Sequence, residues 1–257
     1  MTTILIDGDG LLYRACKAVE IEEQFGPNHH VLFSSFHDAK DKYNRLLEDL
    51  LDNLSDVDDL RYKVYLSGSH NWRYQVLPSY KSNRVDRKPL CYARTKEWLL
   101  DDCSAVMESS MEADDLIAMV MSTYEDCAAV SQDKDFYSVP DKFIRLDGDM
   151  NPQPTALTTP PSARFNHLVQ AVAGDRVDGY YGCKGYGPKK SVKFLNDLVS
   201  VEDEIQVNEI QDVWKEVEDL FTASGHEMGE AKVNATVAHL IHDDSGVDRP
   251  WLIDYGV

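Results

Sequence analysis

The stretch Ile4-Leu-Ile-Asp-Gly-Asp-Gly10 decides the fold class of this chain. Three consecutive apolar residues are typical of a buried strand, and the acids and glycines that follow indicate a turn. Leu11 to Val19 then has the apolar spacing of a helix. We therefore expect a strand that ends at the edge of a sheet, with Asp7 and Asp9 at its carboxyl end.

This alternation of strand and helix continues along the first half of the chain. Strands are predicted at 62–66, 103–107, 128–131 and 143–146, and helices at 36–54, 89–100 and 110–124. We expect a loop at 21–32, a connector rich in Pro and Thr at 151–161, and helices at 162–173, 188–199, 205–222 and 229–243. The pattern predicts an α/β fold with a mostly parallel sheet flanked by helices, followed by a helical region.

The composition is that of a folded protein. The 257 residues are 43% hydrophobic, which is enough for a core. The five cysteines form no CxxC pair, so we expect free thiols. Because we find neither a signal peptide nor a run of roughly 20 apolar residues, we expect a cytoplasmic protein that does not enter a membrane.

The net charge of −19 argues at first against a nucleic-acid partner, because phosphate contacts need Lys and Arg. The positive charge is nevertheless concentrated in two places. Residues 72–96 contain seven basic residues and one acid, and residues 184–193 contain four lysines and no acid. Residues 202–230 contain ten acids and a single lysine, a pattern typical of a solvated helix face.

Four groups of acids follow the predicted strands or lie in a turn: Asp7 and Asp9; Glu112, Asp114 and Asp115; Asp133 and Asp135; Asp175 and Asp178. Each group has a structural explanation as a turn, a helix cap or a partner of a helix dipole. Together, however, they would repel one another at one sheet edge unless cations neutralised them. Oxygen ligands suit Mg²⁺ or Mn²⁺, and two such ions can stabilise both oxygens of a phosphodiester under attack.

Two further segments indicate contact with nucleic acid. The segment Asn71-Trp-Arg-Tyr-Gln-Val-Leu-Pro-Ser-Tyr-Lys-Ser-Asn-Arg84 mixes aromatic rings with positive charge, which suits base stacking by Tyr80 and a phosphate contact by Lys81. In 182–191, Gly185 and Gly187 form a tight turn before a helix, with Lys189 and Lys190 at the helix start. An ordinary solvated loop is the alternative for the first segment.

These segments, in this order, resemble the 5′-nuclease superfamily of flap endonucleases and phage 5′–3′ exonucleases, and most of all the replicative exonucleases of T-seven-like phages. The matching segments are Ile6-Asp-Gly-Asp-Gly-Leu-Leu-Tyr-Arg14, Asn71-Trp-Arg73, Tyr80-Lys-Ser-Asn-Arg84, Glu112-Ala-Asp-Asp115, Asp133-Lys-Asp-Phe136, and Gly174-Asp-Arg-Val-Asp-Gly179 with Gly185-Tyr-Gly187. They span roughly residues 4–199. Any one of them is common, whereas the ordered set is specific.

The resemblance implies a PIN-like nuclease domain at 1–160, a clamp or arch at about 68–102, and a helical DNA-binding region with a helix-three-turn-helix module at 161–257. It implies that Asp7, Glu112, Asp114 and Asp115 hold one metal ion and that Asp133, Asp135, Asp175 and Asp178 lie toward a second. The implied catalytic residues are Lys81, Asp7, Asp115 and Asp133. The implied DNA contacts are Arg73, Tyr80, Lys81, Arg84, Lys88, Gly185, Gly187, Lys189 and Lys190, with a K⁺ ion at the 182–191 turn.

The resemblance also implies an activity. We expect a monomeric, metal-dependent 5′–3′ exonuclease on duplex DNA that releases 5′-phosphorylated nucleotides, with 5′-flap endonuclease and RNA-primer-removal activity in phage replication and recombination. One departure stands against this, because Gly68 occupies the place of an acid that the family usually has after its second strand. One alternative is a non-catalytic protein that binds branched DNA. The other is a phosphatase of the haloacid dehalogenase type, because the segment Ile4-Leu-Ile-Asp-Gly-Asp9 resembles the nucleophile motif of those enzymes.

Overall fold

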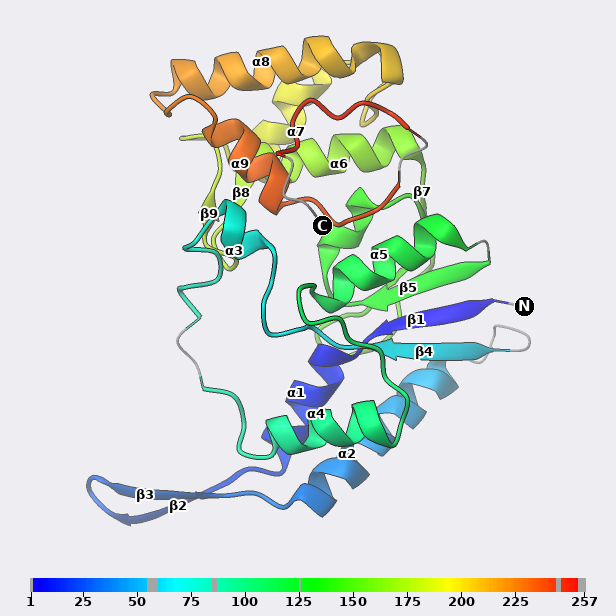
Figure 1. Cartoon of the computed structure of the whole chain (residues 1–257), viewed down its shortest axis with the longest axis vertical. Helices are drawn as coiled ribbons and strands as arrows, with labels where there is room; N and C mark the ends of the chain where they lie inside the picture. Colours follow the sequence, from blue (N-terminus) through cyan, green and yellow to red (C-terminus); the bar gives the residue numbers. More distant parts are fainter. Residues whose placement is uncertain (1, 55–59, 85–86, 125, 244–245, 254–257) are drawn as a thin grey trace.

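The computed structural model describes residues 2–54, 60–84, 87–124, 126–243 and 246–253, and the predicted clamp and helical region are described only within these ranges. A five-stranded sheet lies at the centre, in the order β4-β1-β5-β6-β7 (Figure 1). The strands are β1 (Thr3–Asp7), β4 (Arg61–Tyr65), β5 (Cys127–Ser131), β6 (Asp141–Arg145) and β7 (Ala156–Thr158). The first four run parallel and β7 is antiparallel, so the predicted mostly parallel sheet is confirmed.

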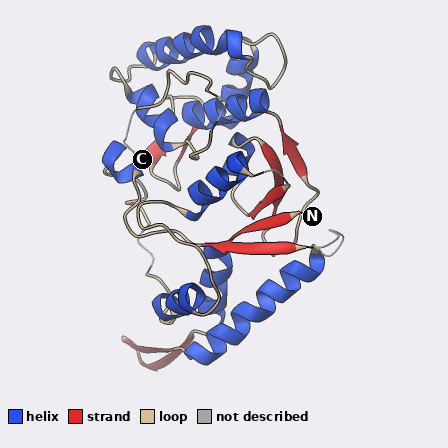
Figure 2. Ribbon diagram, turned by 45° about the vertical axis from the view of Figure 1, so that its right-hand side comes forward, coloured by secondary structure: helices blue, strands red, loops and turns tan. Residues whose placement is uncertain are grey.

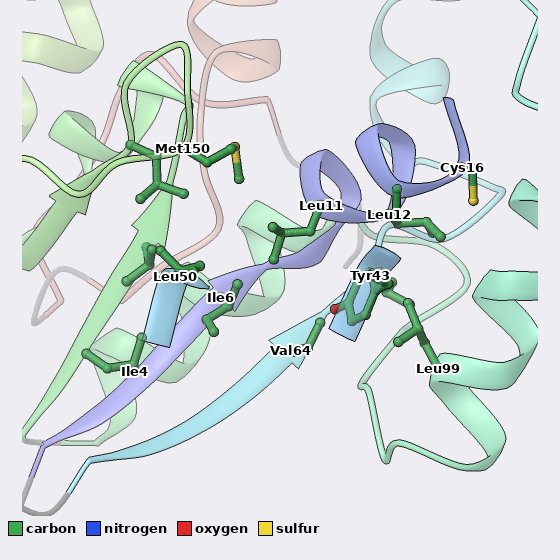
Figure 3. Packing of buried hydrophobic residues seen from close by; sticks show 14 of the residues in the cluster. Ile4, Ile6, Leu11, Leu12, Cys16, Tyr43, Leu50, Val64, Leu99 and Met150 are labelled. Carbon is green, nitrogen blue, oxygen red and sulfur yellow. The ribbon is translucent and has the colours of Figure 1, made fainter. Parts of the chain in front are cut away.

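Helices cover both faces of this sheet because successive side chains of each strand point to opposite sides. Ile4 and Ile6 of β1 pack with α1 (Gly8–Ala18), α2 (Phe36–Asn53) and α4 (Tyr92–Asp101), as Figure 3 shows for the residues labelled there. Leu5 points the other way and packs with α5 (Ala113–Thr123). The two layers are seen from a second angle in Figure 2.

The helical half lies beyond the β7 edge of the sheet (Figure 1). Its elements are α6 (Pro160–Ala173), α7 (Pro188–Asn196), η2 (Val207–Glu209), α8 (Ile210–Ala223) and α9 (Glu230–Val237), with a short hairpin of β8 (Gly174–Asp175) and β9 (Tyr180–Tyr181) between α6 and α7. They share a third apolar cluster that includes Phe165, Trp214 and Trp251. Helix α6 also packs against η1 (Lys134–Ser138), which joins this half to the sheet.

The structure differs from the expected elements in several places, and the helix expected at 229–243 ends at Val237. Residues 21–32 are not a loop, because β2 (Ile21–Gly26) and β3 (His29–Phe33) form a hairpin that extends away from the body (Figure 1). Residues 103–107 form no strand, and only Val106 bridges to Tyr65 beside β4. The connector 151–161 contains β7, the antiparallel edge of the sheet.

A short helix, α3 (Arg73–Val76), lies within the basic segment. All five cysteines are free, as expected. In the described part of the chain, no helix combines the length and the apolar character needed to cross a membrane.

Candidate active site

Asp7 ends β1, Asp133 lies two residues after the end of the neighbouring parallel strand β5, and each caps the start of a helix. Asp7 caps α1 by accepting a hydrogen bond from the amide of Asp9 (3.2 Å), and Asp133 caps η1 by accepting one from the amide of Asp135 (2.9 Å). Ser131 links them, because its hydroxyl donates to Asp7 Oδ2 (2.8 Å) and accepts from the amide of Asp133 (3.0 Å). The capping roles and the gathering of acids at one sheet edge therefore occur together.

A cavity of about 630 Å³ opens at this edge. The ends of β1 and β5 and the β8–β9 turn bring five of the eight predicted metal ligands to it. Its lining consists of Asp7, Gly10, Arg84, Gln132, Asp133, Lys134, Asp135, Arg145, Leu146, Met150, Asp175, Val177 and Asp178.

Three of the acids of this cavity, Asp7, Asp133 and Asp135, resist ionisation. Burial raises the pKa of Asp7 to about 7, and repulsion from the Asp9 charge adds to the effect. Burial likewise raises the pKa of Asp133, and it raises that of Asp135 well above its usual range with a further contribution from the Asp133 charge. Grouped carboxylates with such pKa values favour neutralisation by a cation.

Glu112 and Asp114 lie at the start of α5, and their surroundings differ. Burial raises the pKa of Asp114 well above its usual range, and the negative charge of Glu112 raises it further. Burial also opposes ionisation of Glu112, but the nearby charges of Lys81 and Arg73 outweigh it, so the pKa of Glu112 is lowered. Glu112 is therefore an ionised acid held between cations.

Asp115, a predicted metal ligand and catalytic residue, is fully buried and does not line the cavity. Its oxygens accept two hydrogen bonds from the Arg73 guanidinium (2.6 and 2.9 Å), one from the Trp72 indole (3.1 Å) and one from the amide of Ile241 (3.2 Å). With its acceptor positions used by protein donors, Asp115 has the geometry of a residue that holds the site together.

Arg73 was expected on the DNA, and the structure contradicts this because only 1% of the residue is exposed. Besides Asp115, its guanidinium donates to the carbonyls of Val237 (2.8 Å) and His239 (2.7 Å) and to Glu112 Oε2 (3.3 Å). A cation with these internal partners is not available to a phosphate.

Tyr80 was expected to stack on a base, and the structure contradicts this too, because Tyr80 is only 3% exposed. Its hydroxyl lies 3.1 Å from Glu112 Oε2 and 2.9 Å from Asp178 Oδ2. Burial raises the pKa of Tyr80 far above its usual range, so the hydroxyl keeps its proton and acts as a donor.

Lys81 and Arg84 lie among the acids. Lys81 Nζ is 2.5 Å from Glu112 Oε1 and 3.7 Å from Asp178 Oδ2, and Arg84 Nη2 is 2.6 Å from Asp178 Oδ1. The backbone of Lys81 adopts a positive φ of 53°, and its amide donates to the Asp178 carbonyl (2.7 Å). The predicted catalytic lysine is thus fixed between two of the four acid groups.

The residues at this edge fit a divalent cation in their chemistry. Across the described ranges, no three His, Cys, Asp or Glu side chains converge closely enough to hold a metal ion. Lys81, Arg84 and Lys134 instead pair with Glu112, Asp178 and Asp175. Asp135 Oδ1, however, is buried and accepts no hydrogen bond from the described residues. A buried acceptor without a donor is costly, and an oxygen ligand of this kind suits Mg²⁺.

Gly68 leaves no room for the acid that the family usually has there. A Cβ atom on Gly68 would lie 2.2 Å from the Glu108 carbonyl oxygen and 2.4 Å from that of Ser109. The Gly68 amide donates to the Met111 carbonyl (2.7 Å), which holds the two segments together. The backbone of 108–111 therefore occupies the space that a side chain would need.

The other predicted DNA contacts lie on the surface. Gly185, Gly187, Lys189 and Lys190 are exposed around the start of α7, next to a second cavity of about 680 Å³. The ammonium of Lys190 donates to the Gly185 carbonyl (3.0 Å), and Lys88 is exposed with its ammonium over the Tyr92 ring. These residues form surfaces separate from the acidic cavity lining.

Sequence reasoning missed several residues of the site, among them Ser131 and Lys134. Ser131 binds Asp7, and Lys134 pairs with Asp175 (3.2 Å). Ser131 could have been found, because it is a polar residue at the end of an otherwise apolar strand. Lys134 carries no such signal, since its partner comes from a distant turn.

Comparison with known proteins finds similarity to two phage exonucleases. The chain is 29% identical over 220 residues to an exodeoxyribonuclease of Enterobacteria phage T3, covering 77% of this chain and 68% of that protein. It is 28% identical over 225 residues to an exonuclease of Escherichia phage T7, covering 79% and 70%. No protein-family model matches.

Solved structures share the fold. The flap endonuclease of bacteriophage T5, crystallised as a pseudo-enzyme–product complex with DNA and metal ions, has a TM-score of 0.62 at 16% identity, covering 93% of this chain and 89% of that one. The catalytic core of Rad2 in complex with a DNA substrate has a TM-score of 0.50 at 13% identity, covering 99% and 80%.

Fold, site and relatives together indicate one class of protein: the chain is similar to the 5′-nuclease superfamily of flap endonucleases and 5′-exonucleases, and it shares the fold of these enzymes. Within it, the sequence is similar to the exonucleases of T7-like phages.

Proposed function

We propose that this chain is a metal-dependent 5′–3′ exonuclease that acts on duplex DNA and releases 5′-phosphorylated nucleotides. The observation that carries the proposal is the cavity at the carboxyl edge of the sheet, where five aspartates from three separate segments share one space with Arg84. Lys81 lies beside it, 3.7 Å from Asp178. The exonuclease relatives and the flap endonuclease fold support the same activity.

Two divalent ions, Mg²⁺ or Mn²⁺, are part of the proposal. Asp7, Glu112 and Asp114 would contribute to one, and Asp133, Asp135, Asp175 and Asp178 to the other. When bound, such ions activate the attacking water and stabilise the charge that develops on the phosphate. The raised pKa of Asp7, Asp114, Asp133 and Asp135 and the unpartnered oxygen of Asp135 support this assignment.

The protein's own cations orient the substrate. The Lys81 ammonium is in a position to stabilise negative charge on the scissile phosphate once it leaves Glu112. Arg84, whose side chain is half exposed, would bind a phosphate at the cavity mouth. Lys189 and Lys190, at the start of α7, would hold the duplex, with K⁺ bound at the 182–191 turn.

The proposal extends to the substrates and setting expected from the sequence. The chain would act as a monomer in the host cytoplasm, on 5′ ends, 5′ flaps and RNA primers, during phage replication and recombination. The domain division at residue 160 and the clamp at 68–102 belong to the same proposal.

Cleavage of a 5′-labelled duplex in Mg²⁺ tests the activity. We expect wild type to release labelled 5′-nucleotides and Asp133→Asn to lose about 100-fold or more in rate. Changing even an outer-shell partner of a metal ligand typically costs about 10–100-fold, and Asp133 is proposed as a ligand itself. Asp212→Asn, an exposed acid on α8, is the matched control and should cleave like wild type. Full cleavage by Asp133→Asn, or no cleavage by wild type, would contradict the proposal.

A second candidate is a non-catalytic protein that binds branched DNA. The steric block at Gly68 favours it, since one ligand of the first metal is absent. It predicts tight binding to a 5′-flap duplex with no product in either Mg²⁺ or Mn²⁺, a result that the same assay reports.

A further inference from the structure

The surroundings of the Tyr80 ring leave it no role at the surface. The Arg73 guanidinium carbon lies 5.8 Å from the ring centroid, and Lys81 Nζ lies 4.9 Å from it. Tyr74 packs edge-on against the same ring at 6.1 Å. A base therefore has no face of the Tyr80 ring to stack on. A role for Tyr80 at the site must therefore come from its hydroxyl.

That hydroxyl joins acids from two different parts of the fold. Glu112 precedes α5 on the sheet, whereas Asp178 lies in the β8–β9 turn beside the helical half. Both have an oxygen within about 3.1 Å of the one hydroxyl oxygen. Since a tyrosine hydroxyl has a single proton, it donates to one carboxylate at a time, and both acids must stay within its reach.

The segment that carries Tyr80 is fixed to the same turn. The Lys81 amide donates to the Asp178 carbonyl (2.7 Å), and the Asn83 side chain donates to the Arg176 carbonyl (2.5 Å). Gly179, with a φ of 78°, lies close enough that a Cβ atom would be 3.2 Å from the Ser79 carbonyl oxygen. Tyr80 is therefore held beside the turn, and its hydroxyl reaches across to Glu112.

Tyr80 differs from the other group that contacts both acids. Lys81 also lies near Glu112 and Asp178, but its positive charge neutralises them. The Tyr80 hydroxyl is neutral, so it holds the two carboxylates together while leaving their negative charge available to a metal ion.

We propose that Tyr80 is a positioning residue whose hydroxyl sets the separation between Glu112 and Asp178. The inference rests on the proposed function, which assigns these acids to the two metal-binding groups. It gives Tyr80 a role in metal affinity, through the acids it touches, in place of a role in base stacking.

Tyr80→Phe tests this directly, because it keeps the ring and removes only the hydroxyl. We expect the dissociation constant for Ca²⁺, measured by calorimetry on the DNA-free protein, to rise about tenfold, as for other outer-shell partners of metal ligands. The Mg²⁺ concentration for half-maximal cleavage should rise by a similar factor, while KM for DNA stays within about twofold. Tyr74→Phe, on the exposed ring that packs against Tyr80, is the matched control and should change neither quantity.

The outcomes distinguish a failure of the positioning role of Tyr80 from a failure of the proposed nuclease activity. Unchanged Ca²⁺ and Mg²⁺ dependence in Tyr80→Phe, or a raised KM for DNA alone, would overturn the positioning role. Wild type that binds Ca²⁺ but does not cut DNA would overturn the proposed function, and calorimetry of Tyr80→Phe would still decide the role of the hydroxyl.

A double variant tests whether the Tyr80 hydroxyl acts through Asp178. If the hydroxyl acts through Asp178, the double variant Tyr80→Phe with Asp178→Asn should bind Ca²⁺ no more weakly than Asp178→Asn alone. Additive losses would contradict the link. Thermal melting of each variant checks that the fold is intact.

Discussion

Gly68 is a single position whose neighbours decide what the first acid group can contain. A methyl group there would meet the carbonyl oxygens of Glu108 and Ser109 at 2.2 and 2.4 Å. The protein would have to separate two segments that are joined by backbone hydrogen bonds, such as that from Gly68 to Met111. The absence of the usual acid is therefore part of how this loop packs.

We expect Gly68→Ala to lower the free energy of unfolding by about 1–3 kcal/mol, the usual cost of inserting atoms into packed structure. Urea unfolding measures it. Gly148→Ala is the control, because a Cβ atom there meets nothing within 4 Å. Gly68→Asp should be destabilised at least as much as Gly68→Ala and should bind Mg²⁺ no more tightly than wild type. Tighter Mg²⁺ binding would show that the loop can open to admit an acidic ligand.

A residue could be placed from the sequence when the residues that fix its position lie nearby in the chain, and not when they lie far away. Asp7 and Asp133 were predictable because each directly follows an apolar strand, and parallel strands end at the same edge. Arg73 and Tyr80 were misplaced, because an aromatic and basic segment has the same composition whether it faces DNA or turns inward. The residues that turn them inward lie far away in the chain: Asp115 and Val237 bind Arg73, and Glu112 and Asp178 bind the Tyr80 hydroxyl.

At the scale of elements, the Arg73–Asp115 pair joins α3 to α5, and further hydrogen bonds of the two residues reach the end of α9 and the segment after it. Both residues are buried, at 1% and 0% exposure, and Arg73 also reaches the carbonyls of Val237 and His239. Removing one member of a buried pair leaves the other charge without compensation, which is more costly than losing both.

We expect Arg73→Met and Asp115→Leu each to cost about 3–5 kcal/mol of stability. The double variant should cost less than the sum by about 1–3 kcal/mol, because neither buried charge then remains alone. Chemical denaturation of the four proteins gives the cycle. Arg84→Met removes a pair whose arginine is half exposed and should cost less than about 1 kcal/mol. Strict additivity at Arg73 and Asp115 would contradict the coupling.

Elements with strong local patterns were predicted well. The stripe of apolar residues in α2 and the apolar strands β1 and β5 were predicted near their observed bounds. The β2–β3 hairpin was missed because its residues are mostly exposed and carry no alternation of buried and solvent-facing positions. Residues 103–107 have strand-like composition, yet the chain there leaves β4 after one bridge.

At the scale of the whole molecule, two buried histidines tie stability to pH. Burial lowers the pKa of His167 to about 3 and lowers that of His239 well below its usual range. His167 Nε2 lies 2.7 Å from the Ala235 carbonyl oxygen, which links α6 to α9 in the neutral form. Because the folded-state pKa lies below the unfolded one, the unfolded chain takes up a proton first as the pH falls.

We therefore expect the contribution of His167 to stability to be lost progressively as the pH falls below about 6.5 toward 3, by about 2 kcal/mol at pH 5. The buried aspartates with raised pKa contribute with the opposite sign, so the comparison of wild type with a His167 variant isolates the histidine. Thermal melts from pH 7.5 to 5 measure this. His167→Gln should be less stable at pH 7.5 but should lose less on acidification, whereas His37→Gln, at an exposed position, should follow wild type. Equal pH slopes for His167→Gln and wild type would contradict the assignment.

The contacts of Arg73 also set an order of events during synthesis. Its guanidinium bonds to the carbonyl of Val237, 164 residues further along the chain, and Asp115 accepts from the amide of Ile241. A nascent chain that already carries Asp7, Lys81 and Asp133 still lacks the segment that fixes Arg73 and Asp115. Since a chain is synthesised from its N-terminus, these contacts can form only after residue 241 has emerged from the ribosome, and shorter chains lack the support that they give to Arg73 and Asp115.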